Sequence, residues 1–201
     1  MSTKRTAGEV AAALLIPGGL LALAWWKRGA LMSAVGYAVR SAYAGNFGGK
    51  RTGPVDQIVI HTTEASAESA LSWFGMPHGA AGPTSAHYVV GQDGTVTQAV
   101  PDDRVAWHAG NRAINGRSIG IENEGHAADP ATWTPALLDA LAGLCAQLSN
   151  RYGVPVRHAE WNEPGFIGHV DVPNQDHTDP GRFFDWAAFL NRVAARTAGV
   201  A

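Results

Sequence analysis

The sequence is poor in cysteine and in charge, and each shortage excludes a class of protein. Cys145 is the only cysteine among 201 residues, so no disulfide can form within the chain. It falls within an apolar helical pattern, which is typical of an inert core thiol rather than of a nucleophile. Charged residues make up 16% of the chain and the formal net charge is −2. With this composition the chain has no broad basic surface that could bind nucleic acid. We expect an ordinary soluble surface.

The sequence also lacks an uninterrupted apolar run that would be a clear membrane span. Its longest run, Val10 to Trp26, has 17 residues, which is the short limit for a spanning helix, and Pro17-Gly18-Gly19 breaks it. Two basic residues precede this run, and Ser41-Ala42-Tyr43-Ala44 offers a distant signal-peptide cleavage pattern. We predict an apolar, helical N-terminal extension over residues 1–45. We expect this extension to be directed to a membrane, as a signal peptide, as an anchor or as helices that lie on the membrane surface. The alternative is a helical hairpin that packs on the domain.

The remaining chain, residues 46–201, alternates between strand and helix patterns. Short apolar or β-branched runs predict strands over 57–61, 85–90, 95–100 and 118–123, and Gln92-Asp93-Gly94 is typical of a hairpin turn. Helical spacing predicts helices over 66–74, 135–152 and 182–195. Thr134, Pro135 and Gly153 mark the ends of the longest helix. This order predicts an α/β fold with a central mixed β-sheet flanked by helices.

Two histidines and one aspartate are candidate metal ligands. His61 ends the first predicted strand, where a side chain can leave the core and enter a cleft. His169 follows a glycine, and Asp179 opens an Asp-Pro-Gly turn that restricts the backbone beside the carboxylate. Catalytic zinc usually has three such ligands and leaves a fourth position for water, whose pKa it lowers. The spacing of these residues in the sequence does not by itself favour a metal site, since no closely spaced pair such as His-x-x-x-His is present. Two structural histidines and an aspartate in a simple turn explain the pattern equally well.

Five motifs follow one another in a definite order between Asn46 and Val193. They are Ile58-Val59-Ile60-His61-Thr62-Thr63-Glu64, Ser85-Ala86-His87-Tyr88-Val89-Val90, Gln98-Ala99-Val100-Pro101 through Ala106-Trp107-His108-Ala109-Gly110, Asn115-Gly116-Arg117-Ser118-Ile119-Gly120-Ile121-Glu122, and Gly168-His169 through His177-Thr178-Asp179-Pro180-Gly181. Together they resemble the type 2 family of N-acetylmuramoyl-L-alanine amidases. That superfamily includes phage lysins, anhydro-muropeptide amidases and peptidoglycan recognition proteins. The resemblance covers nearly all of the chain beyond the extension.

The resemblance implies a mixed sheet with one zinc ion per chain at one end. It assigns His61, His169 and Asp179 as the zinc ligands. Glu122 matches the glutamate that handles the proton of the attacking water, and strand alternation lets it face a cleft while its isoleucine neighbours pack in the core. His177 matches the position that steadies the oxyanion.

Two positions depart from the family pattern. Many members carry lysine where this chain has His177, and a histidine supplies the same hydrogen bond only when protonated. Activity is therefore expected to fall at alkaline pH faster than in a lysine enzyme. Ala86 stands where some members carry an assisting tyrosine, which puts more weight on Glu122.

Trp107, His108 and Asn111 are predicted to line the substrate groove. An aromatic ring with adjacent polar groups suits a glycopeptide, whose faces are partly apolar. A core position for Trp107 and a loop-capping role for His108 are equally compatible with the sequence.

The predicted function is zinc-dependent hydrolysis of the amide between the lactyl group of N-acetylmuramic acid and L-alanine, in peptidoglycan or a muropeptide. We expect a monomer that faces the cell wall, exported or phage-encoded, with membrane contact through the extension. Two other functions stay open: a module that binds peptidoglycan without cutting it, and a zinc peptidase acting within the stem peptide. The complete ligand set together with Glu122 favours the amidase.

Overall fold

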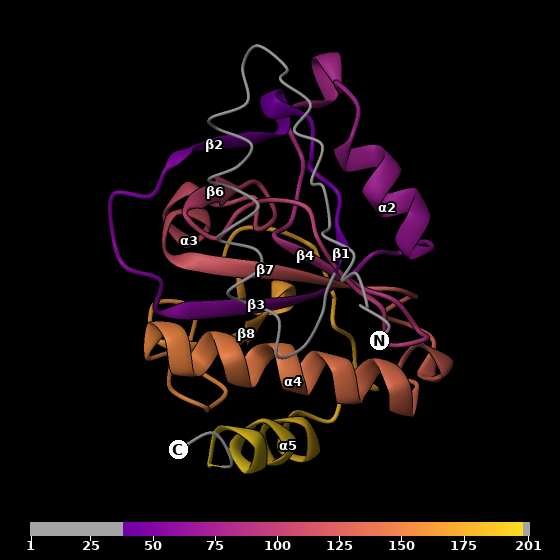
Figure 1. The fold of residues 1–201 in the computed structure, drawn as a ribbon, viewed down its shortest axis with the longest axis vertical. Coiled ribbons are helices and arrows are strands. Elements are labelled where there is room, and N and C mark those ends of the chain that lie inside the picture. The colour runs from indigo at the N-terminus through magenta and orange to yellow at the C-terminus, as the bar shows by residue number, and fades with distance from the viewer. Residues whose placement is uncertain (1–37, 199–201) are drawn as a thin grey trace, which may run out of the picture. The chain divides into compact units, whose positions relative to one another are not determined.

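The computed structural model describes residues 38–198, and the rest of the predicted N-terminal extension lies outside this range. Six strands form the main sheet in the order β1-β5-β4-β7-β3-β8 (Figure 1). In that order they span Ala38–Val39, Val96–Gln98, Tyr88–Val90, Ser118–Asn123, Gln57–Thr62 and Gly165–Gly168. β4 and β5 run antiparallel while all other neighbours run parallel. The predicted mixed sheet is confirmed.

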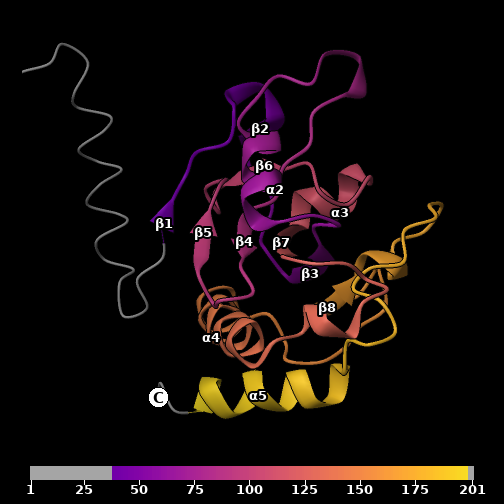
Figure 2. The same cartoon turned by 90° about the vertical axis from the view of Figure 1, so that its right-hand side faces the viewer.

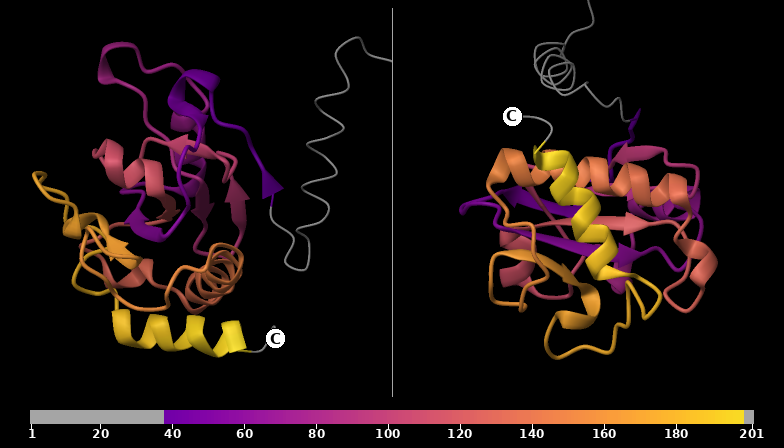
Figure 3. Two further views of the ribbon diagram at one scale, coloured as in Figure 1. Left: turned by 90° about the vertical axis from the view of Figure 1, so that its left-hand side faces the viewer. Right: turned by 90° about the horizontal axis from the view of Figure 1, so that it is seen from below.

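Helices cover both faces of this sheet, as predicted. α4 (Pro135–Tyr152) and α5 (Trp186–Ala198) lie on one side, and α2 (Ala67–Phe74) and α3 (Arg112–Arg117) lie on the other (Figure 2). α5 packs across α4 (Figure 3). Four short 3-10 turns and a separate antiparallel pair complete the described range: η1 (Ala44–Asn46), η2 (Gly79–Ala81), η3 (Pro130–Thr132), η4 (His169–Asp171), β2 (Phe47–Lys50) and β6 (Arg104–Ala106).

The long helix α4 has the ends that its sequence predicts. The Thr134 hydroxyl accepts the amide of Leu137 at 3.1 Å, and Gly153 closes the helix with φ 71°. For α5 the predicted start at Arg182 is wrong. The Asp185 carboxylate accepts the amide of Ala188 at 2.9 Å, so the chain first turns and then enters the helix. Local capping decided this boundary, and a periodic pattern does not resolve it.

Alternation along β3 and β7 separates an apolar face from a polar one. Ile58 and Ile60 of β3, with Ile119 and Ile121 of β7, are fully buried beneath α4 and α5. The intervening residues point to the opposite face, where His61 stands directly beside Glu122 in the parallel register. Ile60 pairs with Gly168, the residue before His169. The carboxyl ends of three neighbouring parallel strands therefore deliver the candidate site residues to one edge.

Residues 38–46 are joined to this sheet. β1 pairs with β5, and Arg40 makes two 2.7 Å bonds to the Glu68 carboxylate of α2. The Asn46 amide donates to the carbonyls of Phe74 and Met76 at 2.8 and 2.7 Å. The last residues of the predicted extension thus contact the domain. Within residues 38–198, no helix combines the length and the apolar character needed to cross a bilayer.

Candidate active site

His61, His169 and Asp179 meet at the carboxyl edge of the sheet. His61 ends β3, His169 opens the turn that follows β8, and Asp179 comes from the next loop. The Nδ1 atom of His61 lies 3.1 Å from Asp179 Oδ2, and the Nδ1 atom of His169 lies 3.4 Å from Asp179 Oδ1. All three side chains are buried, and one donor atom from each lies within 4.8 Å of the others. Residues more than a hundred positions apart in the sequence thus converge at one point.

This donor set fits a metal ion. Ligand atoms 2.0–2.1 Å from a tetrahedral zinc are about 3.3 Å from one another. The nitrogen–oxygen separations of 3.1 and 3.4 Å have that size. Asp179 and Glu122 also place two carboxylates in this buried region, and the ion pairs of Asp179 within the described range are to histidines alone. A bound cation would offset that negative charge.

The protonation states suit metal binding. Burial lowers the pKa of His61 even though Asp179 opposes that shift, so the imidazole is favoured in its neutral, ligating form. For Asp179, burial alone would raise the pKa. Hydrogen bonds from His169 and His61 outweigh burial and hold the pKa of this carboxyl well below its usual range.

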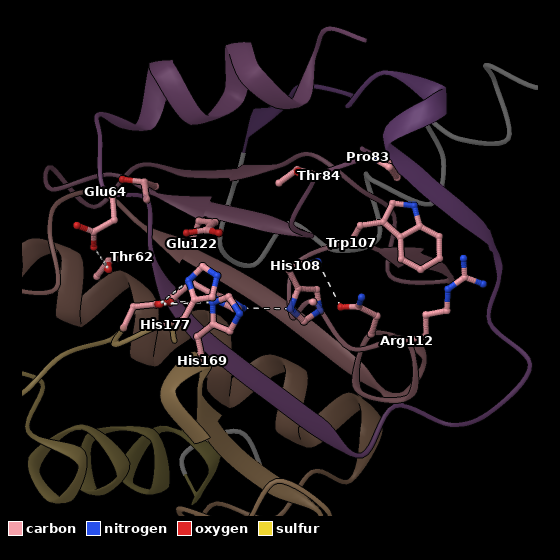
Figure 4. Close-up of a pocket in the computed structure, with 15 residues that line it drawn as sticks. Thr62, Glu64, Pro83, Thr84, Trp107, His108, Arg112, Glu122, His169 and His177 are labelled. Carbon is pink, nitrogen blue, oxygen red and sulfur yellow. Dashed lines mark hydrogen bonds and ion pairs between the residues drawn. The ribbon is translucent and has the colours of Figure 1, made fainter. Parts of the chain in front are cut away.

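Glu122 lies beside the cluster with an unsatisfied carboxylate (Figure 4). Its Oε2 atom is buried and has no hydrogen-bond partner in the described part of the chain. Burial raises the pKa of Glu122 well above its ordinary value, and the charges of Asp179 and Glu64 raise it further. A partly desolvated carboxylate with a free oxygen next to a metal-binding cluster is suited to accept a proton and return it.

His177 lies at the open side of the cluster. Its side chain is 53% exposed, and its Nδ1 atom is 3.6 Å from Asp179 Oδ1. The ring stacks on His169 with centroids 3.8 Å apart and an interplanar angle of 13°. This exposed imidazole lines the pocket, where it can reach a bound ligand.

A pocket of about 580 Å³ opens above these residues. Trp107 and Arg112 lie at one end, Thr62 and Glu64 lie at the other, and Glu122 lies between them (Figure 4). Of the three residues predicted for substrate contact, Trp107 and His108 line the pocket.

Asn111 is not brought into this lining. Its Oδ1 accepts the amides of Ala113 and Ile114 at 3.0 and 3.3 Å and so caps α3. Its neighbours Gly110 and Arg112 line the pocket instead. Sequence reasoning did not find Arg112, because its only signal was its position just after the Trp107–Gly110 motif.

His108 is a buried residue that lines the pocket, and His87 is fully buried next to it. Burial lowers the pKa of both imidazoles well below the ordinary value, and nearby cationic groups lower it further. The amide of Gly120 donates to His87 Nδ1 at 2.9 Å. Both ring nitrogens of His108 have partners inside the protein, His61 and Ser118. His87 therefore has the structural role expected for a buried, hydrogen-bonded ring.

Known proteins are similar to this chain in sequence and in architecture. A family model described as N-acetylmuramoyl-L-alanine amidase matches residues 51–182. N-acetylmuramoyl-L-alanine amidase A of Achromobacter lyticus is 35% identical over 150 residues, which are 68% of this chain and 81% of that protein. The 1,6-anhydro-N-acetylmuramyl-L-alanine amidase AmpD of Escherichia coli is 37% identical over 119 residues, 56% of this chain and 60% of that protein.

Solved structures agree in fold. A selenomethionine derivative of AmpD superposes with a TM-score of 0.65 at 26% identity, covering 79% of this chain and 95% of that one. The hydrolase AmiA of Staphylococcus aureus has a TM-score of 0.64 at 18% identity, over 88% and 90% of the two chains, and supports the fold alone. The resemblance drawn from the five sequence motifs is confirmed: the chain is an enzyme that belongs to the N-acetylmuramoyl-L-alanine amidase family.

Proposed function

We propose that this chain is a zinc-dependent amidase that cleaves the bond between the lactyl group of N-acetylmuramic acid and L-alanine, in peptidoglycan or a muropeptide. The observation that carries this proposal is the convergence of His61, His169 and Asp179 beside the unpaired carboxylate of Glu122. The named activities of the related amidases supply the substrate class. One ion per chain would be held by the two imidazoles and the carboxylate.

A zinc ion bound there would polarise the scissile carbonyl and lower the pKa of water toward neutrality. Glu122 accepts the proton of the attacking water and then delivers a proton to the leaving amine. Its raised pKa suits both transfers, because the same carboxyl can hold the proton between them. His177, exposed at the open side, donates a hydrogen bond to the oxyanion when it is protonated.

The substrate occupies the pocket, with its sugar or stem peptide against Trp107. Arg112 is exposed on the same side, where its guanidinium suits carboxylates of an acidic stem peptide. His108 presents only part of its ring to the pocket, and Asn111 supports the site by capping α3.

The decisive experiment is mass spectrometry of products from a purified disaccharide-peptide. With zinc present we expect intact stem peptide and free disaccharide, and we expect a chelator to stop the reaction until zinc is restored. Binding without turnover would instead support a recognition module. A cut inside the stem peptide would support a peptidase, and turnover that survives complete metal removal would overturn zinc dependence.

We further propose that the enzyme is monomeric and acts at the cell wall, exported or phage-encoded, with residues 1–45 directing it to a membrane. Fractionation of the full chain, followed by N-terminal sequencing, tests this setting. A chain that stays in the soluble fraction with its N-terminus intact would contradict it.

A further inference from the structure

A chain of hydrogen bonds runs from the candidate ligand His61 into the protein interior, away from the pocket. His61 Nε2 lies 3.1 Å from His108 Nδ1, and His108 Nε2 lies 3.2 Å from the Ser118 hydroxyl. That hydroxyl lies 2.7 Å from the carbonyl oxygen of Ile114. His61, His108 and Ser118 are 1%, 7% and 0% exposed, so water does not compete for these contacts.

The far end of the chain sets its direction. The Ile114 carbonyl can only accept, so Ser118 donates its single hydroxyl proton to it. The Ser118 oxygen then accepts from His108 Nε2–H, which leaves His108 Nδ1 as an acceptor in a neutral ring. His108 Nδ1 accepts from His61 Nε2–H. With an ion bound, the remaining nitrogen of His61, Nδ1, then carries the lone pair, and it is the atom that faces Asp179.

The position of the His108 ring is itself built into the fold. A Cβ atom placed on Gly120 would lie 2.3 Å from the ring, so only glycine leaves room for it on this face of β7. The side-chain oxygen of Asn115 accepts the amides of His108 and Ala109 at 3.2 and 2.9 Å, which holds the backbone beneath the ring. The Gly120 and Asn115 contacts do not involve the ring nitrogens of His108. They hold the His108 ring in the same position as its hydrogen bonds to His61 and Ser118 do.

We infer that His108 is a positioning residue for the metal site. Anchored by Ser118 and seated on Gly120, it fixes the tautomer and the orientation of His61 so that Nδ1 is presented to the ion. This inference rests on the proposed metal site. It also explains why His108, which was predicted to contact substrate, has both ring nitrogens hydrogen-bonded to other residues of the protein. Removing a partner of this kind commonly lowers metal affinity by about 10- to 100-fold.

The test measures zinc affinity by competition with a chromophoric chelator in His108→Phe, which keeps a ring over Gly120 and removes both nitrogens. We expect the zinc dissociation constant to rise about 10- to 100-fold. His108→Asn, which retains an acceptor near the Nδ1 position, should recover part of that loss. Ser118→Ala should weaken zinc binding in the same direction and by less. His78→Gln is the matched control, since His78 hydrogen-bonds to the carbonyls of Trp73 and Gly82, stacks on Trp73 and does not line the pocket.

A second readout is independent of affinity. Nitrogen-15 NMR of the zinc-bound wild type should show His108 as the neutral Nε2–H tautomer, which donates to Ser118 and accepts from His61. A predominantly Nδ1–H ring of His108 would overturn the inference, as would unchanged zinc affinity in folded His108→Phe. If that variant does not fold, unchanged affinity in Ser118→Ala overturns it. Failure of the wild type to bind zinc would instead refute the proposed function.

Discussion

The two faces of the central sheet are built on opposite principles, although the same strands supply both. On the face under α4 and α5, Ile119 and Ile121 of β7 are buried among aliphatic and aromatic side chains. On the other face the same strand presents Gly120 beneath a histidine and Glu122 beside the candidate ligands. The apolar face is stabilised by the area it removes from water, and it tolerates apolar substitutions that conserve side-chain volume. The polar face needs a particular partner for each buried nitrogen and oxygen.

Arg51 is an example of such specific pairing at a distance from the candidate ligands. Its guanidinium donates to the carbonyls of Asp102, Asn115, Gly116 and Ser118 at 2.5–3.0 Å, and one nitrogen also lies 2.6 Å from the ring of His87. Burial lowers the pKa of this arginine to about 10. A partly buried cation thus holds the segments behind the site through backbone carbonyls.

The largest effect is expected from the polar face, in His169→Ala. Loss of this imidazole removes one of three metal ligands, so zinc binding should be lost and turnover should fall by about 10³-fold or more. Equilibrium dialysis and muropeptide turnover measure the two together. A variant that keeps its activity would remove His169 from the site.

Glu122→Gln should separate chemistry from metal binding. The amide keeps the shape of the side chain but accepts no proton, so kcat should fall about 10²- to 10⁴-fold while the fold and the zinc content persist. Turnover with metal analysis of the same sample provides the measurement. Near-normal kinetics would exclude Glu122 as the base.

Ile121→Ala tests the apolar face one residue away. Truncation of this fully buried side chain should cost about 2–5 kcal/mol in the free energy of unfolding. Zinc affinity of the folded protein should stay close to that of the wild type. Denaturant unfolding and chelator competition check the two parts, and a loss of zinc affinity comparable to that in His169→Ala would show that the faces are not independent.

The pH dependence of stability distinguishes the faces without any ligand. The pKa of Glu122 is raised above its ordinary 4.5 in the folded, metal-free protein, so the folded state holds this proton more tightly than the unfolded state. That contribution to stability is present below pH 4.5 and is lost as the pH rises toward the folded pKa. Metal-free Glu122→Gln should therefore gain stability relative to the wild type as the pH increases, measured by thermal unfolding. A constant difference across pH would show that the carboxylate is not desolvated.

The smallest effect is expected at the rim of the pocket. Trp107→Ala removes apolar contact with the substrate, and loss of about 1 kcal/mol of binding corresponds to a roughly fivefold rise in KM with kcat retained. Steady-state kinetics on a disaccharide-peptide measure it. An unchanged KM would place Trp107 outside the substrate-binding surface.

Local pattern predicted the apolar face well. The short apolar, β-branched run over 57–61 marked β3, and Thr134 with Gly153 marked both ends of α4. The short strands β1, β2, β6 and β8 were not predicted. Their sequences are too short or too rich in glycine to carry a period, and pairing with distant strands decides their structure.

The sequence by itself determined the order of the motifs, the alternation that turns Glu122 from its isoleucine neighbours, and the residue types of a metal site. Tertiary structure alone decided that His61 and Asp179 lie 3.1 Å apart, that Asn111 caps a helix, and that His108 faces His61 rather than solvent. The physical reason is the range of the interactions. Periodicity and capping act over a few residues, whereas a ligand set and its hydrogen-bonded supports exist only after parallel strands have brought distant segments to one edge.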